Sequence, residues 1–455
     1  EVEKTVPMVE MKLSIAEKIG FGAGDMAINI VMITMQLIIA YFYTDVYGLS
    51  PADMGLLFIV VRLIDAVSDP IMGMITDRCN SAHGHYRPFL LWFAVPFGVS
   101  VYLAFITPDL AYSYKLAWAY FSYILLTLLF TVVTIPYISL IGVITNDPAE
   151  RLSANGYRFV LVKIAAFLVT VVVPALASYL GDGNMSDGYQ PAMGLMGVLG
   201  SVLLLSCFFA TKERIQPVMQ TMSFGAQLRI LFRNDQWILL CVALILLMCG
   251  FVIRGSVAPY YAKYYLDGGD SLVSPFLATG VAASILAMVA STWATKFYCK
   301  VKLFRYSQLS TFVLCVAMYF AVGRDDTVLA FIFTFLIWFA ADLYSPIFWS
   351  SIAEAVDYGQ RKTGTRVSGL AFGGVSFCQK LGMGVAGGLL GYLLSHFNYQ
   401  ADVEQSEFTL NGLALLATVI PGFFYVGVGL IMRRYVISND YYDEIASDLR
   451  LATDQ

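Results

Sequence analysis

The chain has 455 residues, of which 58% are hydrophobic and only 13% are charged. Soluble globular domains carry roughly 45–50% apolar and about 25% charged residues, so this composition excludes a soluble enzyme, a disordered chain and a collagen-like rod. The formal net charge is −4, from 28 Lys and Arg against 32 Asp and Glu. That balance argues against a nucleic-acid-binding protein, which would carry a basic excess.

Apolar segments recur along the chain, and each is long enough to cross a bilayer as a helix, which takes about 20 residues. The sequence therefore predicts an all-α membrane protein with twelve transmembrane helices. The segments are 22–46, 52–76, 88–107, 116–145, 157–180, 192–211, 237–265, 272–297, 304–323, 328–356, 367–395 and 410–432.

The connections between these segments alternate in positive charge. Those at 47–51, 181–191 and 398–409 contain no Lys or Arg, and Lys115 and Arg324 are exceptions on the same side. Cytoplasmic loops carry the excess of Lys and Arg, so both termini are expected in the cytoplasm. The cation-rich connections contain Arg78, Arg87, Arg151, Lys212, Arg214, Arg229, Arg233, Lys296, Lys300, Lys302, Arg305, Arg361, Lys362 and Arg366.

The longest connection, 212–236, divides the spans six and six. We expect an N-terminal six-helix half over 1–211, a cytoplasmic middle loop over 212–236, and a C-terminal half with a cytoplasmic tail over 237–455. Residues 223–233 of the loop are either an amphipathic interfacial helix or a plain connector. Six plus six spans is the layout of major facilitator transporters, whose substrate site lies near mid-membrane.

Charged side chains inside the spans are the main functional signal, because each costs about 2.5–3.5 kcal/mol at the bilayer centre. They must be paired or must line a shared polar cavity. Two of them, Arg158 and Lys163, could instead reach the cytoplasmic surface from a helix end. The set is Asp25, Arg62, Asp65, Asp69, Arg158, Lys163, Arg254 and Lys380.

Asp65 and Asp69 are four residues apart on one predicted helix and therefore share a face. Two carboxylates so close repel each other unless a Na⁺ ion, a shared proton or a Lys from another helix lies between them. Pro70 could leave a backbone oxygen of Asp65 or Ser68 free as a ligand. The hydroxyl of Thr131 either completes an oxygen cage or bonds back to its own helix.

Several motifs match one family over about residues 15–435, and the chain resembles the glycoside–pentoside–hexuronide:cation symporters of the major facilitator superfamily. The motif in the second span is the most specific. The matching residues are Gly22-Ala23-Gly24-Asp25, Tyr43-Thr44-Asp45, Asp65-Ala66-Val67-Ser68-Asp69-Pro70-Ile71-Met72-Gly73, Gly84-His85-Tyr86-Arg87-Pro88, Thr131 with Ile135-Pro136-Tyr137, and Asp357-Tyr358-Gly359.

The resemblance implies a cation site at Asp65, Asp69 and Thr131, with Ser68 beside them. It also implies a sugar-binding acid at Asp25. The family's arginine in the fifth span falls on Arg158, and its lysine in the eleventh span, near the cation carboxylates, falls on Lys380.

The chain departs from the family pattern at three positions. Gly24 stands where a Lys precedes the helix-one acid, Thr134 replaces a galactoside-binding Asp, and Ile138 replaces a Trp. A galactoside is therefore not the expected substrate.

The charges inside the spans bear on the substrate, because three acids face five cations. An acidic sugar such as a uronate or sulfo-sugar would offset the positive excess. Alternatively the cations pair with the acids and the sugar is neutral. The substrate-binding candidates are Asp25, Arg62, Thr134, Arg158, Lys163, Arg254, Trp349 and Lys380, with Phe348, Tyr260 and Tyr261 as further rings that pack on a sugar or only on other helices.

We expect a secondary active symporter that couples Na⁺ or H⁺ to uptake of a sugar or glycoside by alternating access. An uncoupled facilitator or exchanger, a membrane sensor and a membrane-embedded enzyme are the alternatives. The three His lie near loops and the seven Cys form no C-x-x-C pair, so no catalytic residue and no cofactor are expected. We expect a monomer in the bacterial cytoplasmic (inner) membrane. The exact sugar and the choice between Na⁺, H⁺ and Li⁺ stay open.

Overall fold

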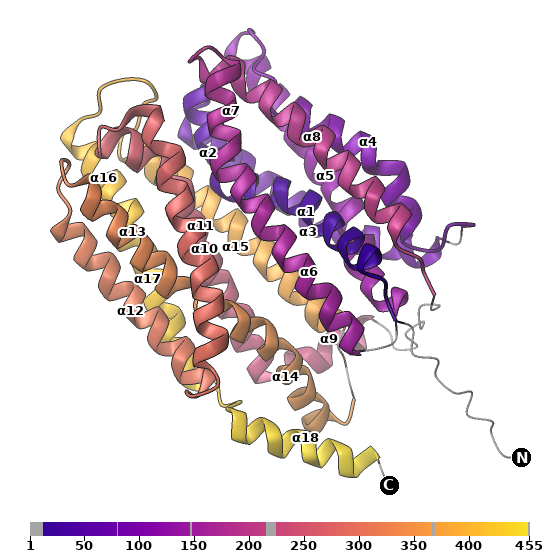
Figure 1. Ribbon diagram of the computed structural model, residues 1–455. Coiled ribbons are helices and arrows are strands. Elements are labelled where there is room, and N and C mark those ends of the chain that lie inside the picture. Colours follow the sequence, from indigo (N-terminus) through magenta and orange to yellow (C-terminus); the bar gives the residue numbers. More distant parts are fainter. Residues whose placement is uncertain are drawn as a thin grey trace, which may run out of the picture. The chain divides into compact units, whose positions relative to one another are not determined.

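The computed structural model describes residues 12–79, 81–145, 148–214, 224–365, 367 and 369–453. In these ranges the chain forms helices joined by loops, together with an isolated antiparallel bridge between Ser81 and Gly84. The prediction of an all-α protein is confirmed. Figure 1 labels the helices in chain order.

The helices form two compact units, which we call unit 1 and unit 2. Unit 1 comprises Glu1–Thr34 and Val67–Met219, and unit 2 comprises Met35–Ala66 and Gln220–Gln455. The boundary between the units therefore falls within the first two long helices, α1 (Ile15–Leu37) and α3 (Pro51–Arg78).

In unit 1, α4 runs alongside both α8 and α5, and α7 packs on α8 (Figure 1). The helices of this unit after α3 are α4 (Arg87–Ala104), α5 (Tyr112–Ile144), α6 (Pro148–Phe167), the π-helical turn η2 (Leu168–Val172), α7 (Val173–Leu180) and α8 (Met185–Ala210).

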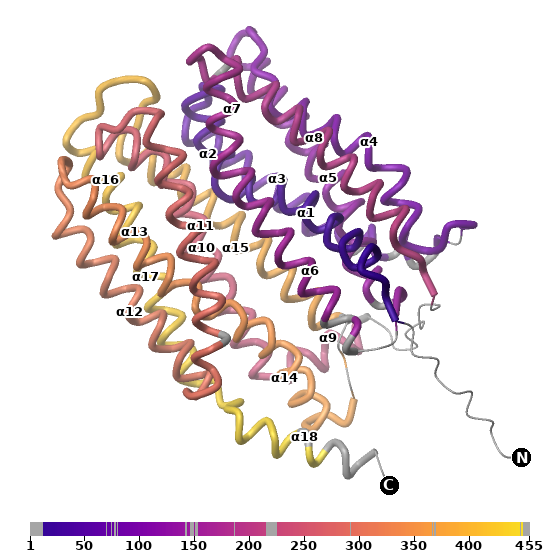
Figure 2. The backbone as a smooth tube through the Cα atoms, in the orientation of Figure 1, coloured from indigo at the N-terminus to yellow at the C-terminus, as the bar shows by residue number. Residues whose placement is uncertain are grey.

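In unit 2, α10 packs along α15 and α17, and α12 packs along α17 (Figure 2). Its elements are α2 (Ile39–Tyr41), η1 (Phe42–Val46), α9 (Phe224–Phe232), α10 (Asp235–Tyr260), η3 (Tyr261–Tyr265), α11 (Gly269–Ala294), α12 (Lys300–Ala321), α13 (Thr327–Asp342), α14 (Ser345–Thr363), α15 (Gly369–His396), α16 (Glu407–Ala417), α17 (Val419–Ile431), η4 (Met432–Arg434) and α18 (Asn439–Thr453).

Several helices begin at a polar capping residue. Ser50 accepts from the backbone N–H of Asp53 at the start of α3, and Asn234 accepts from the N–H of Trp237 at the start of α10. Such caps satisfy backbone donors that have no partner within the helix. Of the two alternatives for residues 223–233, helix or plain connector, the structure has a helix, α9 (Phe224–Phe232).

The two faces of α3 differ sharply. Arg62, Asp65 and Asp69 are buried or half-buried on one face. The opposite face carries a row of exposed apolar side chains at helical spacing, as expected for a helix that faces lipid. This row comprises Leu56, Ile59, Leu63, Val67, Ile71 and Ile75.

Among the described residues, nine helical stretches are long and apolar enough to cross a membrane. The other three predicted segments correspond to α3, α12 and α15, which have 28, 22 and 28 residues. Those helices have the length of a span, but α3 carries Arg62, Asp65 and Asp69 within its apolar stretch. The count of twelve stays a prediction.

Candidate functional site

In unit 1 the predicted sugar-binding acid is paired with the predicted arginine. Arg158 Nε on α6 donates to Asp25 Oδ2 on α1 at 2.6 Å, and Asp25 is buried. The Arg158 guanidinium lies 6.0 Å from the centroid of the Tyr137 ring on α5. Tyr137 is held in place because its hydroxyl donates to the backbone oxygen of Phe21 at 2.7 Å.

The residue before Asp25 explains part of this geometry. A Cβ atom built on Gly24 would lie 2.6 Å from the Tyr137 ring, closer than any ordinary contact. A lysine at this position would not fit against Tyr137. Because Gly24 has no side chain, α1 and α5 can lie close together beside the Asp25–Arg158 pair.

Thr134 lies on α5 three residues before Tyr137, and its side chain is buried. Within the described parts of the chain, its hydroxyl has no hydrogen-bond partner. A buried hydroxyl without a partner costs free energy, so Thr134 is available to a bound polar group. Ile138, at the third departure, is exposed.

The second acid of α3 meets the predicted hydroxyl, also in unit 1. Thr131 Oγ1 on α5 donates to Asp69 Oδ1 at 2.9 Å. Thr131 is buried, while Asp69 and Ser68 are half-buried. The structure thus brings together a carboxylate and a hydroxyl, the oxygen ligands that hard cations take.

The first acid of α3 is in unit 2 and has two cations beside it. Arg62 Nη1 donates to Asp65 Oδ2 at 2.7 Å, and Lys380 Nζ on α15 lies 3.6 Å from Asp65 Oδ1. Asp65 is fully buried, and both cations are largely buried. The two positive charges offset the cost of burying this carboxylate.

The remaining substrate candidates are dispersed. Arg254 on α10 is buried within unit 2, with its guanidinium 5.3 Å from the centroid of the Trp338 ring. Among the residues described, its Nη1 has no hydrogen-bond partner. Trp349 on α14 is exposed and packs edge-on against Phe348, and Lys163 is half-buried on α6.

The motif at residues 84–88 is held by hydrogen bonds within unit 1. Glu213 accepts hydrogen bonds from the backbone N–H groups of His85, Tyr86 and Arg87, at 2.8–2.9 Å. These groups lie at the start of α4, where an acidic side chain is favourable. The motif around Gly84 therefore has a structural role that sequence reasoning did not detect.

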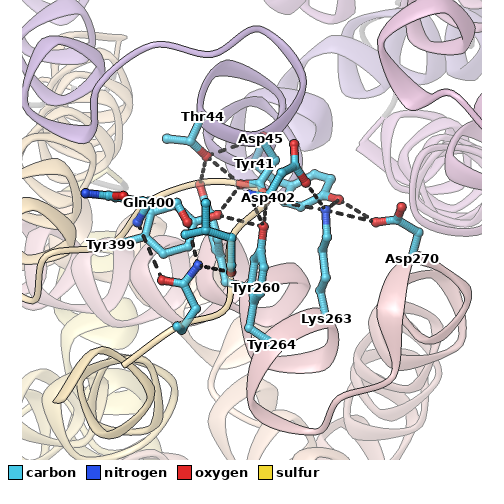
Figure 3. Close-up of polar contacts among 12 residues, drawn as sticks. Tyr41, Thr44, Asp45, Tyr260, Lys263, Tyr264, Asp270, Tyr399, Gln400 and Asp402 are labelled. Carbon is cyan, nitrogen blue, oxygen red and sulfur yellow. Dashed lines mark hydrogen bonds and ion pairs between the residues drawn. The ribbon is translucent and has the colours of Figure 1, made fainter. Parts of the chain in front are cut away.

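Sequence reasoning also missed a polar cluster in unit 2, drawn in Figure 3. Its centre is Asp45 in η1, a buried carboxylate that accepts hydrogen bonds from the hydroxyls of Tyr264 and Tyr399. Lys263 Nζ lies 3.6 Å from Asp45 and 3.0 Å from Asp402. Asp45 was evident in the sequence only as part of a motif. Tyr260, one of the predicted sugar-packing rings, belongs to this cluster through its hydroxyl, 2.7 Å from that of Thr44.

The helical fold of the chain matches that of solved transporter structures. The crystal structure of a D-xylose-proton symporter matches with a TM-score of 0.63, covering 93% of this chain and 97% of that one. At 14% identity this likeness shows the fold alone.

Sequence comparison defines the family. The family described as MFS/sugar transport protein matches residues 20–439. The inner membrane symporter YicJ of Escherichia coli (strain K12) is 36% identical over 424 residues, which cover 93% of this chain and 92% of YicJ. The isoprimeverose transporter of Lactiplantibacillus pentosus is 29% identical over 91% of this chain and 86% of its own length. The chain belongs to the glycoside–pentoside–hexuronide:cation symporter family, and it is a multi-pass membrane transporter rather than an enzyme.

Proposed function

We propose that the protein is a symporter that uses a Na⁺ gradient to take up a neutral sugar or glycoside by alternating access. The proposal includes twelve spans in two six-helix halves, a monomer in the bacterial inner membrane, and both termini in the cytoplasm. The observation that carries the coupling is the hydrogen bond from Thr131 to Asp69, because it places two oxygen ligands together inside a membrane protein.

The cation site is proposed at Asp69 and Thr131, with Asp65 and Ser68 on the same helix as further ligands. Na⁺ is favoured over H⁺ because a proton needs a carboxylate but gains nothing from an additional hydroxyl, whereas Na⁺ takes several oxygen ligands. Asp65 has Arg62 and Lys380 beside it, whereas Asp69 accepts the Thr131 hydroxyl, so we place Asp69 at the centre of the proposed site. Proton coupling is the alternative.

The sugar is proposed to bind at Asp25, Arg158 and Thr134 in unit 1. A carboxylate and a guanidinium offer acceptors and donors for sugar hydroxyls, the Tyr137 ring lies against the guanidinium, and the Thr134 hydroxyl can bond a polar group. These groups all come from α1, α5 and α6, so a single unit can present them together.

A neutral substrate is favoured because Arg62, Arg158 and Lys380 each contact a carboxylate of the protein. Much of the positive charge that favoured an acidic substrate is thereby offset inside the protein. Arg254 supports the alternative of a uronate or sulfo-sugar, since its Nη1 has no partner within the described residues. That atom is however buried inside unit 2.

The test begins with a thermal-shift screen of isoprimeverose, methyl β-xyloside and glucuronic acid, each with and without Na⁺, because a ligand that binds the folded state raises its stability. The best ligand is then offered in radiolabelled form to proteoliposomes. Accumulation that needs an inward Na⁺ gradient supports the symporter, and equal uptake with and without any cation gradient supports the uncoupled facilitator. Preferential stabilisation by glucuronic acid would favour the acidic substrate.

A further inference from the structure

Two π-helical turns in unit 2, η1 and η3, have the same local structure. In each, an i→i+5 backbone bond closes the turn, from Tyr47 N to Phe42 O at 2.7 Å and from Leu266 N to Tyr261 O at 3.0 Å. A residue in the left-handed region follows both, Gly48 at φ 84° and Asp267 at φ 50°. Such wide turns are rare and frequently mark functional positions.

Residues at equivalent positions of the two turns meet each other. Asp45 accepts a hydrogen bond from Tyr264, which lies 219 residues later. Tyr41 and Tyr260 directly precede the two turns and are also 219 residues apart, and their rings pack edge-on with centroids 5.7 Å apart. Contacts between equivalent residues are those expected around a local two-fold axis. Figure 3 shows both turns converging on Asp45.

The polar groups of the cluster around this axis bond to one another, and its central carboxylate is buried. Asp45 accepts from Tyr399 at 2.5 Å and from Thr44 at 2.9 Å, besides Tyr264. Its side chain is fully buried. Lys263 links Asp45 to two further acids on other segments, Asp402 at 3.0 Å and Asp270 at 3.3 Å.

The partners of Asp45 come from distant parts of the chain. Asp45 follows the first long helix, whereas Tyr264 and Lys263 end the seventh predicted span and Tyr399 lies between the last two. We propose that Asp45, Lys263, Tyr264 and Tyr399 form the outer gate of the transport cycle, closed in this structure. This rests on the alternating access of the proposed function and on the proposed orientation, which puts the cation-poor loops outside.

The chemistry of the contacts suits a gate. Hydrogen bonds to a charged group contribute specificity, and water can replace each of them when the cluster opens. An apolar contact of the same size would instead expose its surface to water when the cluster opens, and that exposure costs free energy. The π-turns η1 and η3 lie between the long helices and the loops that follow them, at a position where such wide turns often accompany function.

The test uses a reporter cysteine just inside the cluster. Ser256 is buried on α10, one turn before Tyr260, and donates to the backbone oxygen of Gln36 at 2.8 Å. In S256C, a membrane-impermeant maleimide is added outside intact cells and the labelling rate is measured. The same protein without S256C gives the background from native cysteines.

Asp45→Asn and Tyr264→Phe are the gate variants, and Arg324→Gln is the matched control because Arg324 pairs with Glu407 in an exposed ion pair of the same unit. We expect about tenfold faster labelling in both gate variants, the change that ~1.4 kcal/mol makes in an equilibrium constant, and no change in R324Q. Unchanged labelling in both gate variants would overturn the gate. The readout needs neither sugar nor cation, so failure of coupled transport with faster labelling would refute the proposed function and leave the gate standing.

Discussion

Thr131 on α5 donates a 2.9 Å hydrogen bond to Asp69 on α3, so a hydroxyl and a carboxylate from two helices of unit 1 lie side by side. Each is an oxygen ligand, and together they define the proposed Na⁺ site. Under the proposed function this hydroxyl is the group that favours Na⁺ over H⁺, because a proton gains nothing from an additional oxygen ligand.

Replacing Thr131 by Val should therefore weaken Na⁺ binding about tenfold, since a hydrogen bond to a charged group contributes ~1.5–3 kcal/mol. Thr131→Ser keeps the hydroxyl and serves as the control. The Na⁺ concentration that gives half of the thermal stabilisation measures the effect. Equal values in both variants would exclude Thr131 as a ligand.

Asp65 and its two cations allow a stability prediction. Asp65→Asn should lower the free energy of unfolding by about 3–5 kcal/mol, because it leaves Arg62 and Lys380 buried without that carboxylate. Lys380→Gln should cost less, because Arg62 still contacts Asp65. The double variant D65N/K380Q should be more stable than D65N alone. Thermal unfolding in detergent gives the order, and a double variant less stable than D65N would contradict the pairing.

Asp25→Asn and Arg158→Gln should each abolish sugar-induced stabilisation, because each removes half of the pair that is proposed to hold the sugar hydroxyls. Stabilisation by Na⁺ should persist, since Asp69 and Thr131 are untouched. Thermal shift with the sugar and with Na⁺, measured separately, checks both parts. Loss of the Na⁺ response together with the sugar response would indicate that the pair is structural.

Gly24→Ala should destabilise the protein by ~1–3 kcal/mol, because the added methyl group meets the Tyr137 ring. Gly156→Ala on α6 is the control, since a Cβ there has nothing within 4 Å. That substitution should be neutral or slightly stabilising, as Ala is the better helix former. Melting temperatures of the purified variants decide, and a G24A variant as stable as G156A would show that the contact relaxes freely.

Sequence reasoning reached the features whose signal is local or energetically costly. Charges within apolar segments must find partners, and this alone led to Asp25, Arg158 and Lys380 as residues of buried polar contacts. The four-residue spacing of Asp65 and Asp69 likewise follows from one helix. The all-helical fold follows from segment length and hydropathy.

The missed features depend on pairings that no spacing reveals. Asp45 and Tyr399 are 354 residues apart, and nothing in either segment indicates the other. Glu213 meets the start of α4 from 126–128 residues away. The burial of Arg254 over Trp338 is a matter of tertiary packing that charge alone cannot predict.

The most direct test of the account is uptake of the best sugar from the screen into proteoliposomes, with an inward Na⁺ gradient, with equal Na⁺ on both sides, and with an inward H⁺ gradient alone. The account predicts accumulation above the outside concentration only with the Na⁺ gradient. Asp69→Asn should lose this accumulation and keep exchange of sugar down its own gradient. An identical plateau under all three conditions, or normal accumulation in D69N, would contradict Na⁺ coupling at Asp69.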